Sequence, residues 1–185
     1  MSLRVCVFCG SKSGTSAAYV ESAKRLGTAI ARKGHGLVYG GGNVGLMGAV
    51  AEAAHEAGAT VTGVIPEALL PVEISGKTVG EMIVVKDMHE RKATMAKLAD
   101  AFVALPGGLG TMEELFEVAT WKQLGFHAKP VIMLNVDGYY DGLISFLENA
   151  NTKGFVSNAN KFIIQNGADA DEVLDLISAS TTSTS

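Results

Sequence analysis

Three glycines precede a predicted helix in the stretch PGGLGTMEE, residues 106–114. Gly107, Gly108 and Gly110 permit backbone conformations in which successive N–H groups point at one place. The helix expected over 111–124 adds the positive end of its dipole. Such a nest binds an anion, and a phosphate carried by a small molecule is the expected guest.

Carboxylates follow these glycines directly, at Glu113 and Glu114, with Glu117 one helical turn beyond. One interpretation is structural, because Thr111 and Glu114 match the T-x-x-E pattern of a capping box. The other is chemical. With a phosphate in the nest, the acids would lie near the sugar of a phosphorylated ligand, where a carboxylate stabilises the positive charge that develops as a glycosidic bond breaks. The residues alone leave both interpretations open.

Cationic side chains stand at the start of another predicted helix, in DMHERKATM at 87–95. Arg91 offers a planar guanidinium that can hold phosphate or ribose oxygens with two hydrogen bonds, and Lys92 is its neighbour. The structural alternative is an exposed charged patch on a helix. Near the nest, the two cations would complete a site for a sugar phosphate.

A second glycine-rich loop, YGGGNVGLMG at 39–48, follows a predicted strand and satisfies G-x-G-x-x-G. Gly40, Gly42 and Gly45 supply the pattern, and Gly41 and Gly48 are the other glycines of the stretch. The pattern allows three interpretations: a phosphate or mononucleotide contact, a tight turn that packs a helix on a sheet, or a dinucleotide site with Glu67 as its acidic residue. The third would make the protein an NAD-dependent oxidoreductase. Nucleoside-triphosphate chemistry is unsupported, because Pro71 replaces the glycine expected before GKT at 76–78.

The elements that position these loops alternate along the chain between short apolar strands and helices. The expected strands are 4–9, 36–39, 59–65, 81–85, 101–105, 130–134 and, more weakly, 162–164; the expected helices are 15–33, 46–57, 88–99, 111–124, 139–153 and 168–178. This alternation predicts a Rossmann-like, doubly wound parallel sheet with helices on both faces, which binds ligands at the carboxyl ends of its strands. The long connection at 66–80 is a candidate part of the site. We expect one nucleotide-binding domain over 1–179 and a disordered tail at 180–185.

Composition narrows the function further. The 185 residues carry a formal charge of −4 without a basic run, which argues against nucleic-acid binding. No apolar stretch approaches the length of a membrane span or a signal peptide, so we expect a cytoplasmic protein that does not bind membranes. Cys6 and Cys9 form a CxxC within a predicted strand. We interpret them as packing residues rather than a redox pair.

Several stretches together resemble a known family. They are YGGGNVGLMG, DMHERKATMAKLADAFVALPGGLGTMEELFEVATWKQLG and KPVIMLNVDGYYDGLISFL. They are similar to the LONELY GUY (LOG) family of cytokinin riboside 5'-monophosphate phosphoribohydrolases, whose signature is PGGxGTxxE. The similarity extends from Val5 to Gly154.

The resemblance implies hydrolysis of the N-glycosidic bond of cytokinin riboside 5'-monophosphates, and of AMP, to free base and ribose 5-phosphate. It implies a homodimer whose second subunit completes the site, with no metal and no organic cofactor. Arg91 and Glu114 match the catalytic pair; the substrate-binding positions are Glu73, Lys92, Gly107, Gly108, Gly110, Thr111 and Thr120, to which we add Glu113 and Glu117.

Two other functions remain as alternatives, a non-catalytic nucleotide sensor and the NAD-dependent enzyme. Members of this family have also been called possible lysine decarboxylases, which implies pyridoxal phosphate, but no lysine stands in a context that favours a Schiff base. The sequence does not identify the base. Four apolar residues are candidates to line its pocket: Met88, Met95, Met112 and Trp121.

Overall fold

Seven parallel strands form one sheet in the order β4-β3-β2-β1-β5-β6-β7 in the computed structural model, which describes residues 2–74 and 78–182, the side chains of Glu73 and Thr182 excepted. The strands are β1 (Arg4–Phe8), β2 (Gly36–Tyr39), β3 (Val61–Pro66), β4 (Glu81–Val85), β5 (Ala101–Ala104), β6 (Val131–Leu134) and β7 (Gln165–Gly167). The predicted doubly wound α/β fold is confirmed.

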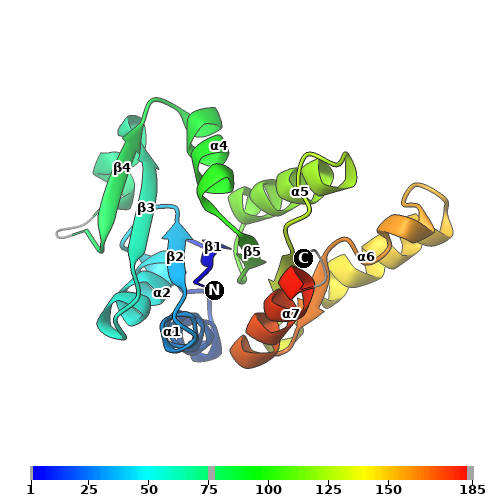
Figure 1. The fold of residues 1–185 in the computed structure, drawn as a ribbon, viewed down its shortest axis with the longest axis horizontal. Helices are drawn as coiled ribbons and strands as arrows, with labels where there is room; N and C mark the ends of the chain where they lie inside the picture. Colours follow the sequence, from blue (N-terminus) through cyan, green and yellow to red (C-terminus); the bar gives the residue numbers. More distant parts are fainter. Residues whose placement is uncertain (1, 75–77, 183–185) are drawn as a thin grey trace.

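Helices cover both faces of the sheet (Figure 1). They are α1 (Ala17–Arg32), α2 (Gly45–Glu56), α3 (Leu70–Glu73), α4 (Met88–Leu98), α5 (Leu109–Gln123), α6 (Asp141–Thr152) and α7 (Ala170–Thr182), with short 3-10 turns η1 (Glu67–Leu69), η2 (Val136–Gly138) and η3 (Asn158–Asn160). Helices α1, α2 and α7 pack on one face, and α4, α5 and α6 on the other. No helix in the described part of the chain is long and apolar enough to cross a membrane.

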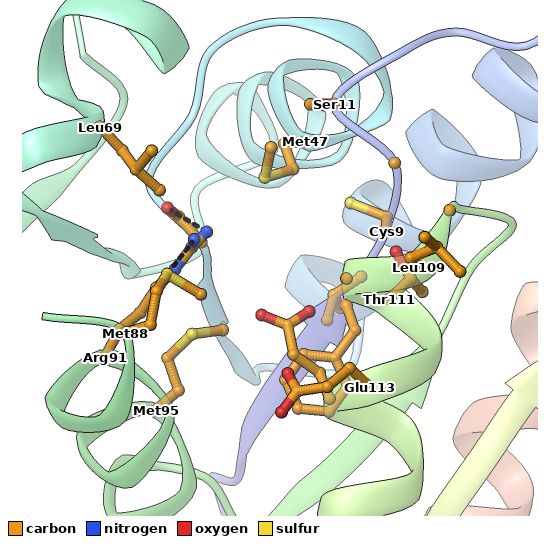
Figure 2. Close-up of a pocket in the computed structure, with 17 residues that line it drawn as sticks. Cys9, Ser11, Met47, Leu69, Met88, Arg91, Met95, Leu109, Thr111 and Glu113 are labelled. Carbon is orange, nitrogen blue, oxygen red and sulfur yellow. Dashed lines mark hydrogen bonds between the residues drawn. The ribbon is translucent and has the colours of Figure 1, made fainter.

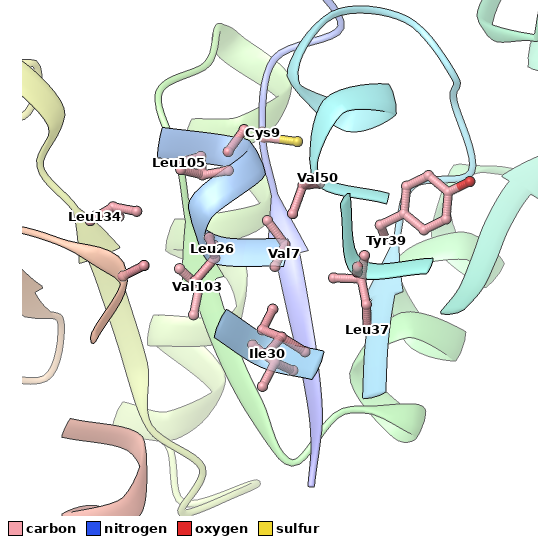
Figure 3. Packing of buried hydrophobic residues seen from close by; sticks show 14 of the residues in the cluster. Val7, Cys9, Leu26, Ile30, Leu37, Tyr39, Val50, Val103, Leu105 and Leu134 are labelled. Atoms are coloured by element: carbon pink, nitrogen blue, oxygen red, sulfur yellow. The ribbon is translucent and has the colours of Figure 1, made fainter. Parts of the chain in front are cut away.

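The central strand β1 shows how the sequence fills both layers. Val5 and Val7 face the core under α1 and α2, whereas Cys6 and Phe8 face the core under α4 and α5, because side chains alternate along a strand. Figure 3 shows the first of these cores, with Val7 beside Leu26 of α1. Cys9, just beyond the strand, belongs to this first core. The two cysteines therefore lie on opposite faces of the sheet, where they pack rather than pair.

Three element predictions need correction. The connection at 66–80 carried no predicted helix, but it begins with η1 and α3. Pro71 lies in the first turn of α3, where its missing N–H costs nothing. The last strand is β7 at Gln165–Gly167, not 162–164, and Phe162 is exposed. The helix expected to end at 178 continues as α7 as far as Thr182, into the first residues of the expected tail at 180–185. Within it the Ser180 and Thr181 hydroxyls donate to carbonyls one turn back. Residues 183–185 lie outside the described part.

The order of strands reverses at β1: β2, β3 and β4 are added on one side of it, and β5, β6 and β7 on the other. Strand β1 pairs with β2 on one side and with β5 on the other, and Phe8 is in register with Ala104. The loops that follow β1 and β5 therefore leave the sheet side by side, and the Gly10 N–H donates to the Pro106 carbonyl at 3.1 Å. In open α/β sheets this crossover is where ligands bind.

Candidate functional site

A cavity of about 320 Å³ opens at this crossover. Its walls come from the loop after β1, Gly40 after β2, Leu69 of η1, helix α4 and the beginning of α5. The polar and charged side chains that line it are Ser11, Arg91, Thr111, Glu113 and Glu114. Figure 2 shows Arg91 on one wall and Thr111 and Glu113 on the opposite wall. The cavity thus joins the two glycine loops and the two charged helix starts that the sequence singled out.

Helix α5 begins earlier than the sequence suggested. Its N-cap is Gly108, which has no side chain to accept from the first-turn N–H groups, and its first residue is Leu109. Thr111 therefore lies inside the helix, only 3% exposed. The capping-box interpretation of Thr111 and Glu114 is wrong, because a cap must precede the helix. The N–H groups of the first turn are left for another acceptor.

The signature glycines have different surroundings. A side chain on Gly107 would lie 2.1 Å from the Thr111 Oγ1, so the threonine hydroxyl occupies that space. Side chains on Gly108 or Gly110 would meet nothing within 4 Å, and both residues line the cavity. Glycine is thus not needed for packing at 108 and 110. The open space is the volume that an anion on these N–H groups would fill.

Arg91 is the buried cation of the cavity, 5% exposed. Its Nη2 donates to the Gly40 carbonyl at 2.9 Å, and its Nη1 lies 3.7 Å from the Met88 Sδ (Figure 2). A Cβ on Gly40 would lie 2.1 Å from the same Nη2. Gly40 therefore sets the position of the guanidinium. The alternative of an exposed charged patch is wrong for Arg91.

The acids of α5 divide into two groups. Lys92 forms ion pairs with Glu113 and with Glu117, the second at 3.1 Å, and thereby ties α4 to α5. Hydrogen bonding to Glu113 raises the pKa of Lys92. Glu114, which lines the cavity together with Glu113, lies close to the central strand. Burial raises the pKa of the Cys6 thiol, and the charge of Glu114 raises it further. The α5 helix thus presents Glu114 to the cavity and Glu117 to Lys92.

The second glycine loop contributes mainly packing. A Cβ on Gly45 would lie 2.4 Å from the Ser11 backbone, and one on Gly41 would lie 2.7 Å from the Met82 side chain; both glycines have positive φ. Gly42 is buried. Of the five glycines at 40–48, Gly40 is the one that lines the cavity. The tight-turn interpretation therefore describes Gly41 and Gly45.

The remaining predicted residues are spread more widely. Thr120 is exposed on α5 and does not line the cavity, and Glu73 ends α3 with its side chain outside the described part. Met88 and Met95 line the cavity, whereas Met112 and Trp121 pack against the second core.

Sequence reasoning missed several lining residues, among them Ser11, Met47 and Leu69. Only Ser11 carried a usable signal. It follows Gly10 at the carboxyl end of the first strand, where ligands of such sheets bind.

The fold and cavity define a class of protein. It is a doubly wound α/β protein in which an uncapped helix start lines one cavity with a buried arginine and a carboxylate. Helix starts of this kind favour anions such as phosphate.

Comparison with known proteins identifies the family. The model of a family described as "Possible lysine decarboxylase" matches residues 47–177. The chain is 54% identical over 171 residues to the cytokinin riboside 5'-monophosphate phosphoribohydrolase LOG7 of Arabidopsis thaliana, covering 92% of this chain and 79% of that protein. It is 52% identical to the LOG enzyme of Oryza sativa subsp. japonica, covering 92% and 71%. The chain belongs to the LONELY GUY family.

Solved structures agree on the fold. A molybdenum cofactor carrier protein from Chlamydomonas reinhardtii aligns with a TM-score of 0.73 at 24% identity, over 99% of both chains. A molybdenum cofactor binding protein from Rippkaea orientalis gives 0.72 at 24% identity, over 97% of both. At this identity the likeness concerns the fold alone.

The decarboxylase description implies pyridoxal phosphate, and the cavity does not fit it. Pyridoxal phosphate needs a lysine for its Schiff base. Among the described residues that line the cavity none is a lysine, and nearby Lys92 is held protonated by Glu113 and Glu117. We derive no chemistry through this cofactor. Within the described residues, no three His, Cys, Asp or Glu side chains come together to hold a metal ion.

Proposed function

We propose that this protein hydrolyses the N-glycosidic bond of cytokinin riboside 5'-monophosphates, releasing the free base and ribose 5-phosphate. One observation carries the proposal: the first turn of α5, whose N-cap Gly108 has no capping side chain, lines the same cavity as Arg91 and Glu114. The names of the relatives, which match at 51–56% identity, support the same reaction.

The three features would act on different parts of one substrate. The phosphate would lie on the N–H groups around Gly108 and Gly110, with Thr111 beside it. Glu114 would face the ribose C1', stabilising the oxocarbenium ion and orienting the attacking water. In the balanced reaction the C1'–N bond breaks, the water oxygen bonds to C1', and the base leaves with a proton. Arg91 would hold ribose or phosphate oxygens and assist departure of the base.

The apolar side of the cavity supports a base with an apolar substituent. Met47, Met88, Met95 and Leu69 line it. Methionine side chains adapt to irregular apolar groups, so a prenyl chain on adenine would find a fitting surface. We propose that N6-isopentenyl-AMP is preferred and that AMP is also hydrolysed. Chromatography of the free base released from each nucleotide tests this preference; equal kcat/KM for both would remove it.

The catalytic assignment is tested by Glu114→Gln. Turnover should fall by at least about a hundredfold, since one electrostatic contact of the transition state is lost. Nucleotide binding, measured by calorimetry, should persist within about threefold, because glutamine preserves the shape of the site. The matched control is Glu21→Gln, on the exposed side of α1. Near-normal turnover in Glu114→Gln would contradict the assignment, and binding without turnover in the unaltered protein would favour the nucleotide sensor.

We also propose a homodimer. Helix α6 has no buried residue along its length, and Phe146 on it is 60% exposed. Nearby in sequence, Phe155 is 90% and Phe162 74% exposed. Large exposed apolar side chains that gather into a patch mark association sites, and we propose that these three contribute to one. The mass of the particle in light scattering tests the proposal, and the mass of a single chain would overturn it. A cytoplasmic location stays a prediction from the sequence.

A further inference from the structure

Three consecutive carbonyl groups of the loop after β5 are held from outside the loop. The Leu105 carbonyl accepts from the Tyr140 hydroxyl at 2.6 Å, the Pro106 carbonyl accepts from the Gly10 N–H at 3.1 Å, and the Gly107 carbonyl accepts from the Tyr139 hydroxyl. The next carbonyl, of Gly108, accepts from the Met112 N–H within α5. Every peptide plane from 105 to 108 is therefore fixed in orientation.

The two tyrosines come from the turn between β6 and α6, which is built to present them. Asp137 and Gly138 both have positive φ, 51° and 69°, which turns the chain sharply ahead of the pair. The Tyr140 N–H donates to the Asn135 Oδ1 at 2.7 Å, and the Asn135 Nδ2 donates to the Asp141 Oδ1 at 2.7 Å. This short network fixes the turn against the loop after β5.

Tyr139 and Tyr140 differ in their surroundings. Tyr140 is 1% exposed and belongs to the second core, where burial raises its pKa so that its hydroxyl remains a donor. Tyr139 is 43% exposed, and its ring meets Tyr19 and Tyr140 edge to face. Loss of the Tyr140 hydroxyl would disturb the core. Loss of the Tyr139 hydroxyl would chiefly release one carbonyl of the loop.

The Gly107–Gly108 peptide separates two hollows. Tyr139 lines a hollow of about 280 Å³ that shares Gly10, Ser11 and Gly108 with the main cavity. In a trans peptide the C=O and the following N–H point in opposite directions. With the Gly107 carbonyl turned toward Tyr139, the Gly108 N–H is turned away from it, and the cavity that holds Arg91 and Glu114 does not include Tyr139.

We propose that Tyr139 is a positioning residue, whose hydroxyl orients the Gly107–Gly108 peptide so that the Gly108 N–H faces the phosphate of the substrate. The residue acts through the backbone and does not touch the substrate. The consequence for catalysis rests on the proposed function, whereas the consequence for anion binding does not. Recognition of the phosphate thus depends on a side chain 32 positions along the chain.

The test compares Tyr139→Phe with the control Tyr19→Phe. The control keeps the edge-to-face contact between the rings at 19 and 139 and removes a hydroxyl that does not bond to the loop after β5. In Tyr139→Phe we expect KM for N6-isopentenyl-AMP to rise about fivefold, the effect of one lost hydrogen bond, with kcat within about twofold. The affinity for inorganic phosphate, followed by the amide shifts of Gly108 and Gly110 in NMR, should weaken by the same factor. The thermal midpoint should match that of Tyr19→Phe.

Two results would overturn the proposal: unchanged phosphate affinity in Tyr139→Phe, or an equal weakening in Tyr19→Phe. If the unaltered protein hydrolyses no nucleotide, the proposed function fails, and the phosphate titration still decides the role of Tyr139. Hydrogen exchange of the Gly108 to Met112 amides gives a further readout. Faster exchange confined to these amides in Tyr139→Phe supports positioning, and faster exchange across the whole sheet shows a structural role.

Discussion

Arg91 is a buried cation, and its guanidinium occupies space that is open because residue 40 is a glycine. Its guanidinium reaches across from α4 to the carbonyl of Gly40, 51 positions earlier in the chain. The glycine that had appeared to belong to a nucleotide fingerprint is needed because any Cβ there would overlap Nη2. The contact between Arg91 and Gly40 thus explains the first glycine of G-x-G-x-x-G.

Gly40→Ala should therefore impair catalysis through Arg91. The methyl group would lie 2.1 Å from Nη2 and would push the guanidinium aside. A displacement of about 1 Å in a reacting group can cost about a hundredfold, so we expect kcat/KM to fall by about that factor. The control is Gly142→Ala on α6, where a Cβ would meet nothing within 4 Å. Equal activity in both variants would show that the position of Arg91 does not matter.

At the scale of single elements, the start of α5 contains a glycine that the helix itself does not require. Gly110 lies in the first turn of the helix, where alanine is the better helix former by about 1 kcal/mol and where the structure offers room for a methyl group. That room is part of the cavity.

Gly110→Ala should thus stabilise the protein slightly while weakening substrate binding. We expect the free energy of unfolding in urea to stay level or rise by up to about 1 kcal/mol, and KM for the nucleotide to rise at least about tenfold, because the methyl group fills the anion seat. A lower stability with unchanged KM would mean that the glycine serves the backbone.

The turn after α5 contains a pH-sensitive contact. The His127 Nε2 lies 2.9 Å from the Val118 carbonyl, and its Nδ1 accepts from the Lys129 N–H at 3.2 Å. One nitrogen donates and the other accepts, which requires a neutral ring. Burial lowers the pKa of His127 below 6.5.

Acidification should destabilise the protein through this ring. Because the folded pKa lies below the unfolded value, the unfolded chain takes up the proton first, and stability falls as pH drops below about 6.5. Burial lowers the pKa of His35 as well, so that part of the effect stays in a variant at 127. His127→Gln should show a smaller loss between pH 7.5 and 5.5 in urea unfolding than the exposed control His55→Gln. Parallel curves for the two variants would rule out the contribution.

The order and type of the elements could be predicted because each core strand and helix carries a local signal. The apolar runs of β1, β2, β5 and β6 and the periodic face of α1 are readable without partners. Strand β7 lacked that signal, since QNG is polar and pairs only through its backbone at one edge. The helix start at Gly108 was missed because a threonine in an S/T-x-x-E pattern looks like a cap wherever it falls.

The sequence predicted many residues of the candidate site, but not the hydrogen bonds and ion pairs between them. The glycines, Arg91 and Glu114 follow from residue types after strands. The bond from Arg91 to Gly40, the ion pairs of Lys92, and the Tyr139 hydroxyl on Gly107 join residues 21 to 51 positions apart. These contacts exist only once the parallel sheet brings successive loops to one edge, so no local pattern in the sequence could indicate them.

At the scale of the whole molecule, the proposed dimer would bury exposed apolar side chains on and after α6, of which Phe146 is one. We expect Phe146→Ser to shift the protein from dimer toward monomer in light scattering, without lowering the stability of the single chain, because Phe146 is 60% exposed there. Val84→Ser is the matched control, an apolar residue 53% exposed on the edge strand β4. Dissociation by Val84→Ser alone would place the interface at that edge instead.

The placement of Cys6 and Cys9 on opposite sides of one strand has a practical consequence. The rate at which a thiol reagent labels each cysteine should report a different event. Cys6 is fully buried, and its raised pKa disfavours the reactive thiolate, so a thiol reagent reaches it only when the sheet opens. Cys9 lines the cavity, so its rate of labelling should slow when a nucleotide is bound. A single labelling time course, resolved by mass spectrometry, would then report global unfolding and site occupancy from the same molecule.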